Sequence, residues 1–235
     1  SGTFVVTNAV TSGTNTTVLP INVSPTVDPI AGATEICLSS PTTTLTNATG
    51  GTVAWSSSNT SVATINAATG EVTALTAGST VISYAVTSVE GCVTTVTHNI
   101  DVREQVVIGT QPIPQVIVFN NNAAFSVVAT GTGLSYQWEE STDNGASFNP
   151  ITNGGVYSGA TSSTLNLSVV PASMNAYEYR CVITGTSPCT PETSSSALLT
   201  VGNTGIGLNP LNVSLCDSGN AVFTVAGTGT VSGYQ

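Results

Sequence analysis

The most constraining feature of this chain is the stretch from Tyr136-Gln137-Trp138 to Tyr179-Arg180-Cys181. It places a tryptophan inside one short strand and a tyrosine two residues before a cysteine in a later strand. This arrangement is typical of two antiparallel sheets packed face to face, with the tryptophan between them and the tyrosine at a corner. We therefore predict an all-β sandwich with Trp138 and Tyr179 in its core, and we find no reactive chemistry in this stretch.

A second sandwich is predicted over residues 27–103. Short runs of alternating apolar and polar residues recur here, separated by turn residues at intervals of about 8–12 positions. These runs include Val53–Asn59, Val62–Asn66, Val72–Leu75 and Thr80–Val86. Trp55 lies in the first of them, and we expect it in the core of this module.

The residues of this module also resemble a known family. The segments Trp55–Ile65, Gly70–Leu75 and Ala77–Ile82 are similar to the bacterial Ig-like group 2 module. That family occurs in intimin/invasin-type adhesins and in many other surface proteins. The resemblance covers most of residues 45–90 and implies an immunoglobulin-like β-sandwich.

The next module resembles a different group of immunoglobulin-like repeats. The resemblance rests on short segments of residues 104–202, namely Tyr136–Trp138, Asp143–Gly145, Val156–Ala160, Tyr179–Cys181 and Ser194–Val201. Such repeats occur in very large secreted proteins of Bacteroidota, including gliding-motility adhesins and other cargo of the type IX secretion system. The resemblance implies a structural or adhesive repeat and carries no catalytic residues.

An internal repeat predicts that another module begins near the end of the chain. Ala123–Thr132 aligns with Ala221–Thr230 at the same offset that aligns Tyr136 with Tyr234. A constant offset indicates repeated modules. We therefore predict tandem immunoglobulin-like modules in a linear array: the last two strands of a preceding module (1–26), complete modules (27–103 and 104–202), and the start of a truncated module (203–235).

The charge of the chain limits its partners. Only 6% of the residues are charged and the net charge is −10, whereas about 25% of a typical soluble domain is charged. Arg103 and Arg180 are the only basic residues, and binding nucleic acid or an anionic membrane surface requires many of them. No apolar run approaches the roughly 20 residues of a membrane span. We therefore predict neither nucleic-acid binding nor membrane insertion.

The cysteines indicate an oxidising, extracellular compartment. None of the five forms a C-x-x-C pair, so no zinc site is expected. We predict a disulfide between Cys37 and Cys92, with two free buried thiols as the alternative. A cross-hairpin disulfide is predicted between Cys181 and Cys189. Cys216 is left over, and we expect its partner beyond the end of the chain, an intermolecular bridge being the alternative.

Acidic residues gather at two places. Glu139, Glu140 and Asp143 lie on one predicted loop, where three carboxylates could hold calcium weakly. The alternative, which we favour, is a solvated loop. Asp101 and Glu104 lie at the junction of the two modules, where they could clamp the modules or bind calcium; a solvated linker is favoured there too.

No catalytic site is predicted, and no cofactor. His98 is the only histidine, and no G-x-S-x-G motif accompanies it. The sequence favours a structural stalk segment of a large secreted, multi-domain cell-surface adhesin or filament, for attachment or gliding motility. Its expected partners are neighbouring modules of the same chain, with surface glycans or other cell-surface proteins as further ones. The alternatives are a glycan-binding module, a spacer of a secreted enzyme, and an immunoglobulin-like protein of a phage surface.

Overall fold

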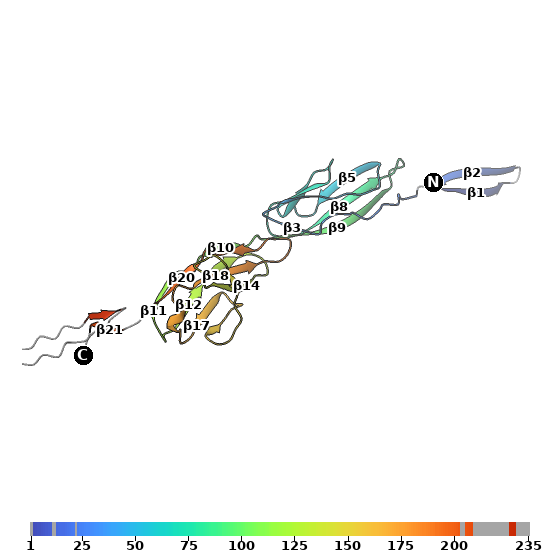
Figure 1. The fold of residues 1–235 in the computed structure, drawn as a ribbon. Helices are drawn as coiled ribbons and strands as arrows, with labels where there is room; N and C mark the ends of the chain where they lie inside the picture. Colours follow the sequence, from blue (N-terminus) through green and yellow to red (C-terminus); the bar gives the residue numbers. More distant parts are fainter. Residues whose placement is uncertain (1, 11–12, 22, 203–204, 209–225, 229–235) are drawn as a thin grey trace, which may run out of the picture. The chain divides into compact units, whose positions relative to one another are not determined.

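The computed structural model describes residues 2–10, 13–21, 23–202, 205–208 and 226–228 (Figure 1). These residues are almost entirely β-structure, and their one helical segment is the short 3-10 turn η1 (Ala172–Met174). The predicted all-β fold is confirmed. The chain divides into two compact units. Unit 1 contains residues 1–105 and 187–189, and unit 2 contains residues 106–186 and 190–235.

Unit 1 contains two facing sheets. The larger sheet has the order β3-β9-β8-β5, in which β3 runs parallel to β9 and the other neighbours are antiparallel. Its strands are β3 (Glu35–Cys37), β5 (Thr52–Ser57), β8 (Gly78–Thr87) and β9 (Val93–Arg103). The smaller sheet has the order β4-β7-β6, with β4 (Thr42–Thr44), β6 (Ala63–Ile65) and β7 (Glu71–Ala74).

Strict alternation along the strands builds the core of unit 1, because successive side chains of a strand point to opposite faces. On β8, Ile82, Tyr84 and Val86 are buried while their neighbours are more exposed. Residues of both sheets and of the adjoining loops meet in one apolar cluster: Ile30, Ile36, Leu45, Val62, Ala63, Val72, Ala74, Ile82, Tyr84, Val86, Ile100 and Val102. The turn before β7 requires Gly70, whose φ is 72° and whose missing Cβ would lie 2.4 Å from the Leu45 carbonyl oxygen.

Unit 2 also contains facing sheets. The largest has the order β11-β20-β18-β14-β15, with β19 also pairing with β18. Its strands are β11 (Gln115–Val118), β14 (Ser135–Ser141), β15 (Asn149–Pro150), β18 (Glu178–Thr184), β19 (Glu192–Thr193) and β20 (Ala197–Gly202). The next sheet has the order β12-β17-β16, with β12 (Ala123–Ser126), β16 (Tyr157–Ser158) and β17 (Thr164–Leu167). A short pair joins β10 (Val107–Thr110) to β13 (Val128–Thr130).

Unit 2 has its own core, centred on Trp138, Phe125 and Tyr179. Each of these rings has a relative exposure of 0%. Phe125 of β12 and Leu165 and Leu167 of β17 belong to one sheet and face Trp138 and Tyr179 of the other. Because each unit buries a separate apolar cluster, each has the internal core that a self-standing domain needs.

Two further strand pairs lie toward the ends of the chain. Strand β1 (Gly2–Val10) pairs antiparallel with β2 (Gly13–Ile21), as expected from the apolar runs there. Strand β21 (Gly205–Leu208) pairs antiparallel with β22 (Ala226–Thr228).

Candidate functional site

The cysteine pairing differs from the one predicted. Cys37 forms a disulfide with Cys189, and their Cα atoms are 5.1 Å apart. The segment Ser187–Cys189 lies between β18 and β19 in sequence, yet it belongs to unit 1. Cys92 and Cys181 are free. The predicted bridges Cys37–Cys92 and Cys181–Cys189 are therefore wrong.

Strand register explains why Cys37 does not meet Cys92. Cys37 is paired with Arg103 at one end of β9, whereas Cys92 comes just before Val93 at the other end. About ten residues of strand at roughly 3.3 Å each separate the two positions by about 30 Å. A disulfide needs Cα atoms within about 7 Å.

The second predicted bridge fails because its two cysteines belong to different surroundings. Cys181 lies opposite Trp138 in the β14–β18 pair and is fully buried in the core of unit 2. Burial raises the pKa of its thiol to about 11. Cys189 belongs to unit 1. Cys216 and the expectation about its partner lie outside the described residues.

Trp138 is held in the core by a directed hydrogen bond. Its indole Nε1 donates to the Ser162 carbonyl oxygen at 2.8 Å. Tyr179 packs against Phe125 with ring centroids 4.7 Å apart, and its hydroxyl lies 3.1 Å from that of Tyr157. Burial raises the pKa of Tyr179. Tyr179 thus holds the start of β18 in place through its contact with the Tyr157 side chain.

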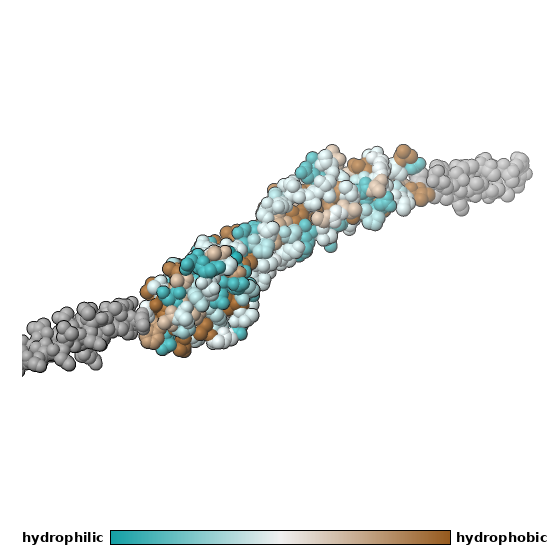
Figure 2. All heavy atoms as spheres, in the orientation of Figure 1, coloured by the Kyte–Doolittle hydropathy of each residue, from teal (hydrophilic) through white to brown (hydrophobic). Residues whose placement is uncertain are grey.

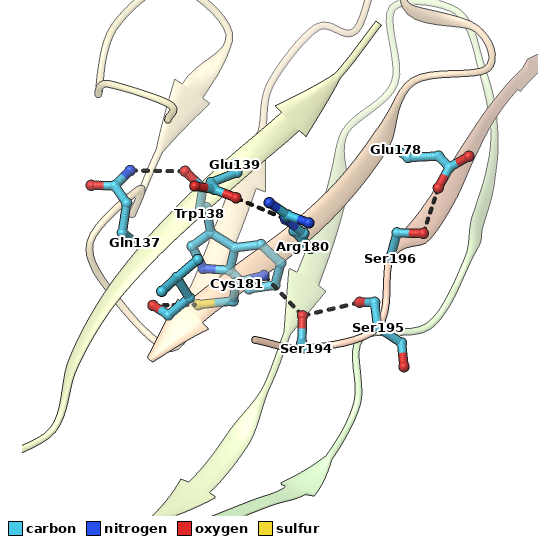
Figure 3. Close-up of polar contacts among 10 residues, drawn as sticks. Gln137, Trp138, Glu139, Glu178, Arg180, Cys181, Ser194, Ser195 and Ser196 are labelled. Carbon is cyan, nitrogen blue, oxygen red and sulfur yellow. Dashed lines mark hydrogen bonds and ion pairs between the residues drawn. The ribbon is translucent and has the colours of Figure 1, made fainter. Parts of the chain in front are cut away.

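Polar contacts continue along the same strands (Figure 3). The backbone N–H of Cys181 donates to Ser194 Oγ at 2.8 Å, and that hydroxyl donates to the Ser195 carbonyl at 3.0 Å. The Ser196 hydroxyl donates to the Glu178 carboxylate. The Ser194 contacts join a side chain to backbone, and the Ser196–Glu178 contact joins two side chains and is exposed. The Ser194 hydroxyl satisfies the buried N–H of Cys181, as a packed core requires.

The acidic loop does not form a cluster. Glu139 accepts from Arg180 Nε at 2.7 Å, and Glu140 accepts from the Tyr157 hydroxyl at 2.5 Å. Asp143 instead caps its own loop. In the described part of the chain, no group of three His, Cys, Asp or Glu residues is placed to hold a metal ion. The calcium alternative for this loop therefore has no geometric support.

Hydroxyl groups saturate the Asp143 carboxylate. It accepts from Ser147 Oγ at 2.6 Å and N at 2.9 Å, and from Ser141 Oγ at 2.7 Å. These bonds, the one from the Ser147 hydroxyl first, lower the pKa of Asp143 to about 2. The arrangement closes the turn that contains Asn144 and Gly145, both with positive φ.

At the end of β9, the charged groups pair within unit 1. Arg103 donates to Glu35 at 2.7 Å and to Asp101 at 3.1 Å, and the hydrogen bond to Glu35 raises the pKa of the guanidinium. His98 contacts the Ala33 carbonyl oxygen at 3.0 Å. Asp101 also accepts from the Ser79 hydroxyl at 2.5 Å, so its carboxylate is held by Ser79 and Arg103 together.

Trp55 differs from its expected place. It is only partly buried, and it packs on Tyr84 with ring centroids 4.5 Å apart. Both rings line an open hollow of about 240 Å³, together with Leu45, Thr46, Asn47, Val53, Ala68 and Thr69. No residue lining this hollow is charged. The indole N–H of Trp55 has no hydrogen-bond acceptor among the described residues, unlike that of Trp138.

Sequence reasoning missed two features: the Cys37–Cys189 bond and the exposure of Trp55. Spacing alone cannot choose among cysteine connectivities. The exposure of Trp55 depends on whether another strand pairs with β5, and the alternating pattern of β5 itself does not show that.

The fold defines the chain as a tandem immunoglobulin-like β-sandwich protein. Residues 17–98 match the family model of the bacterial Ig-like domain (group 2), and residues 107–203 match that of a domain of unknown function (DUF8696). No curated protein matches the sequence. No helix in the described residues is long and apolar enough to cross a membrane.

Solved structures share this fold at low sequence identity. Extracellular domains 3–5 of Drosophila OTK match with a TM-score of 0.53 at 15% identity, over 80% of this chain and 69% of theirs. The eight N-terminal Ig domains of Down Syndrome Cell Adhesion Molecule match at 0.59 and 12%, over 85% and 28%. Three N-terminal domains of the outer capsid protein Hoc of bacteriophage RB49 match at 0.52 and 13%, over 75% and 69%. At such identities the likeness shows the fold alone.

Proposed function

We propose that this chain is a stalk segment of a large secreted, multi-domain cell-surface adhesin or filament that serves attachment or gliding motility. The observation that carries the proposal is the pair of separate cores, each complete within its own unit. Modules of this kind add length by repetition. We propose 1–26 as the end of a preceding module, 27–103 and 104–202 as complete modules, and 203–235 as the start of another.

Three further observations support this function. The chain resembles arrays that include extracellular domains and a cell adhesion molecule. Its disulfide suits an oxidising, extracellular location. In Figure 2, much of the coloured surface is pale, which marks side chains of intermediate hydropathy. Neighbouring modules are its proposed partners, and surface glycans or other cell-surface proteins would be bound elsewhere in the full protein.

Replacing the segment within the full-length protein tests this function. Deleting residues 27–202 from the full-length protein and inserting two unrelated immunoglobulin-like modules of similar length should preserve cell attachment. The reason is that a stalk contributes length and not recognition. The control is a deletion without replacement, which should reduce attachment. If only the native segment restores attachment, it binds the target itself, and the glycan-binding alternative takes its place.

A second candidate is a phage surface protein, because the RB49 outer capsid protein shares the fold. The position of the gene separates the two. Neighbouring virion genes would favour the capsid role, and neighbouring secretion or surface-anchoring genes would favour the stalk.

A further inference from the structure

The edge strands of the two units are protected to different degrees. An unpaired strand edge exposes backbone donors and acceptors to other chains, and proteins usually blunt it with shortness, charge, proline or a cover. Within residues 23–202, the edge strands β3, β4, β6, β10, β11, β12, β13, β15 and β16 have two to four residues each. Strand β3 also carries Glu35 and the disulfide-bonded Cys37, and β15 contains Pro150.

Two longer stretches have a strand on one side only: β5, and residues 93–100 of β9, because β3 pairs only with Asp101–Arg103. Of these two, only β5 borders the hollow lined by Trp55 and Tyr84. Strand β5 has six residues, Thr-Val-Ala-Trp-Ser-Ser, and lies at the edge of its sheet with only β8 as a neighbour. It carries no charge and no proline, and its register with β8 is continuous, without a bulge. Thr52, Val53, Ala54 and Ser56 are exposed. None of the usual protective features is present on this edge.

The register shows which backbone groups of β5 are free. The Ser58 N–H donates to the Val81 carbonyl. Hydrogen-bonded and non-hydrogen-bonded pairs alternate along an antiparallel ladder, so every second pair counted from Ser58–Val81, including Ala54 with Ala85, is hydrogen-bonded. Val53 and Trp55 alternate with these positions, and their N–H and C=O groups point away from β8. In the described residues, neither makes another backbone hydrogen bond.

The side chains next to this edge line a hollow that can accept an apolar group. Val53 and Trp55 lie on the inner face of β5 and line the hollow of about 240 Å³ described above. A strand added to β5 would place every second side chain on this same face. The edge and the hollow therefore favour one kind of occupant: an extended, uncharged strand with alternating apolar residues.

We propose that β5 pairs antiparallel with β5 of a second copy of this chain. The strand itself has the required chemistry, since Val53 and Trp55 alternate on one face of an uncharged segment. The chain carries a net charge of −10, so copies repel each other at most places, but no carboxylate of β5 opposes their approach. A two-fold pairing of one patch with itself is the commonest form of self-association.

The chemistry selects a register for this pair. With Ala54 opposite Ala54 of the second copy, the smallest side chains meet at the two-fold axis. Each Val53 then lies across from Trp55 of the second copy, a favourable pairing of a β-branched and an aromatic side chain. The free groups of Val53 and Trp55 form four backbone hydrogen bonds in this register. One strand pair is a small contact, so the association is weak for single chains and grows when many copies are displayed together.

Sedimentation of the whole chain over a wide concentration range tests the pairing. The chain should dimerise reversibly, and Val53→Lys should lower the association constant by more than about tenfold, or about 1.4 kcal/mol, because a charge on the edge opposes strand addition. Val89→Lys is the matched control. It makes the same change in charge at an exposed valine between β8 and β9, outside both strands, and should leave the dimer intact. Circular dichroism checks that both variants fold.

Cross-linking tests the register. Ala54→Cys should join two copies through a disulfide, since residues facing each other across a non-hydrogen-bonded pair have Cα atoms about 4.5 Å apart. Ser83→Cys, on the same outer face but on β8, which has β5 and β9 on its two sides, should not cross-link. A chain that stays monomeric, or a dimer insensitive to Val53→Lys, overturns the proposal. Binding of an unrelated extended peptide by a monomeric chain overturns it in favour of a different occupant.

Discussion

The two tryptophans occupy similar strands in the two units, yet their surroundings differ. Trp138 on β14 is fully buried, and β14 has neighbours on both sides, β18 and β15. Trp55 on β5 is partly exposed, and β5 has a neighbour on one side only. In unit 2, the Ile151 N–H also donates to the Trp138 carbonyl at 2.9 Å. The comparison teaches that burial of the ring depends on whether a further strand flanks the strand that carries the tryptophan.

Truncating each tryptophan is the strongest way to break this comparison. Trp138→Ala should destabilise unit 2 by about 4 kcal/mol, since it leaves a large cavity and an unpaired Ser162 carbonyl. Trp55→Ala should cost unit 1 only about 2 kcal/mol, because part of the ring already faces solvent. Urea unfolding followed by circular dichroism measures both. The remaining tryptophan reports by fluorescence on the other unit. A larger loss for Trp55→Ala would contradict the comparison.

Removing the disulfide should affect unit 1 more than unit 2. Cys189→Ser should lower the stability of unit 1 by about 3 kcal/mol, in the usual range for a disulfide. Cys92→Ser is the control, and should change stability by less than about 0.5 kcal/mol because this thiol makes no bond. Thermal unfolding with and without reductant measures the difference, and equal effects of the two substitutions would refute the pairing.

Trypsin offers a direct assay of the same bond. The chain contains no lysine, and cleavage after Arg103 and Arg180 separates Cys37 and Cys92 from Cys181 and Cys189. With Cys37 bonded to Cys189, residues 1–103 and 181–235 should stay joined without reductant and separate with it. Before unfolding, Cys92 should be alkylated faster than Cys181, whose thiol is buried and has a raised pKa of about 11. Separate fragments without reductant would exclude the Cys37–Cys189 bond.

A smaller effect is expected at the polar contacts behind Trp138. Ser194→Ala removes the acceptor of the buried Cys181 N–H and should cost unit 2 about 1–2 kcal/mol. Ser195→Ala removes an exposed side chain and should be nearly neutral. Hydrogen exchange at the Cys181 amide reports the loss locally. Unchanged protection of that amide in Ser194→Ala would show that the contact does not hold β18.

The smallest expected effect is the pH dependence of the Asp143 loop. The pKa of Asp143 is lowered from 3.8 to about 2 in the folded chain, so the ionised carboxylate favours the folded state. This contribution is complete above about pH 4 and is lost as the pH falls through about 2. Asp143→Asn should remove that pH dependence and leave unit 1 unchanged. Amide exchange at Ser147 between pH 2 and pH 5 measures it, and an identical pH profile in Asp143→Asn would exclude the role.

The sequence predicted the strands well, because alternation of apolar and polar residues is a local property. The runs around Val72 and Ile82 became β7 and β8 with their apolar residues inward. It also placed Trp138 and Tyr179 correctly within the core of unit 2. The fold class followed from these runs and from the turns between them.

The remaining features depend on contacts between distant residues. The bond between Cys37 and Cys189 joins positions 152 residues apart, and it depends on a loop of three residues that the alternation of β18 does not describe. The partial exposure of Trp55 depends on the absence of a strand beside β5. Both depend on which strands and loops lie next to each other in the fold, and no single stretch of sequence specifies that.

The bond between Cys37 and Cys189 also changes how the chain would respond to tension. If the two ends are pulled apart, the force passes from Cys37 to Cys189 through the sulfur atoms and bypasses residues 38–188. That stretch includes every strand from β4 to β18. At about 3.4 Å per residue, residues 38–188 have a contour length of roughly 500 Å, and the intact bond prevents this segment from extending. While it is intact, pairs whose two strands both lie in that stretch, such as β8 with β9, are shielded from the force, and reduction would release the hidden length.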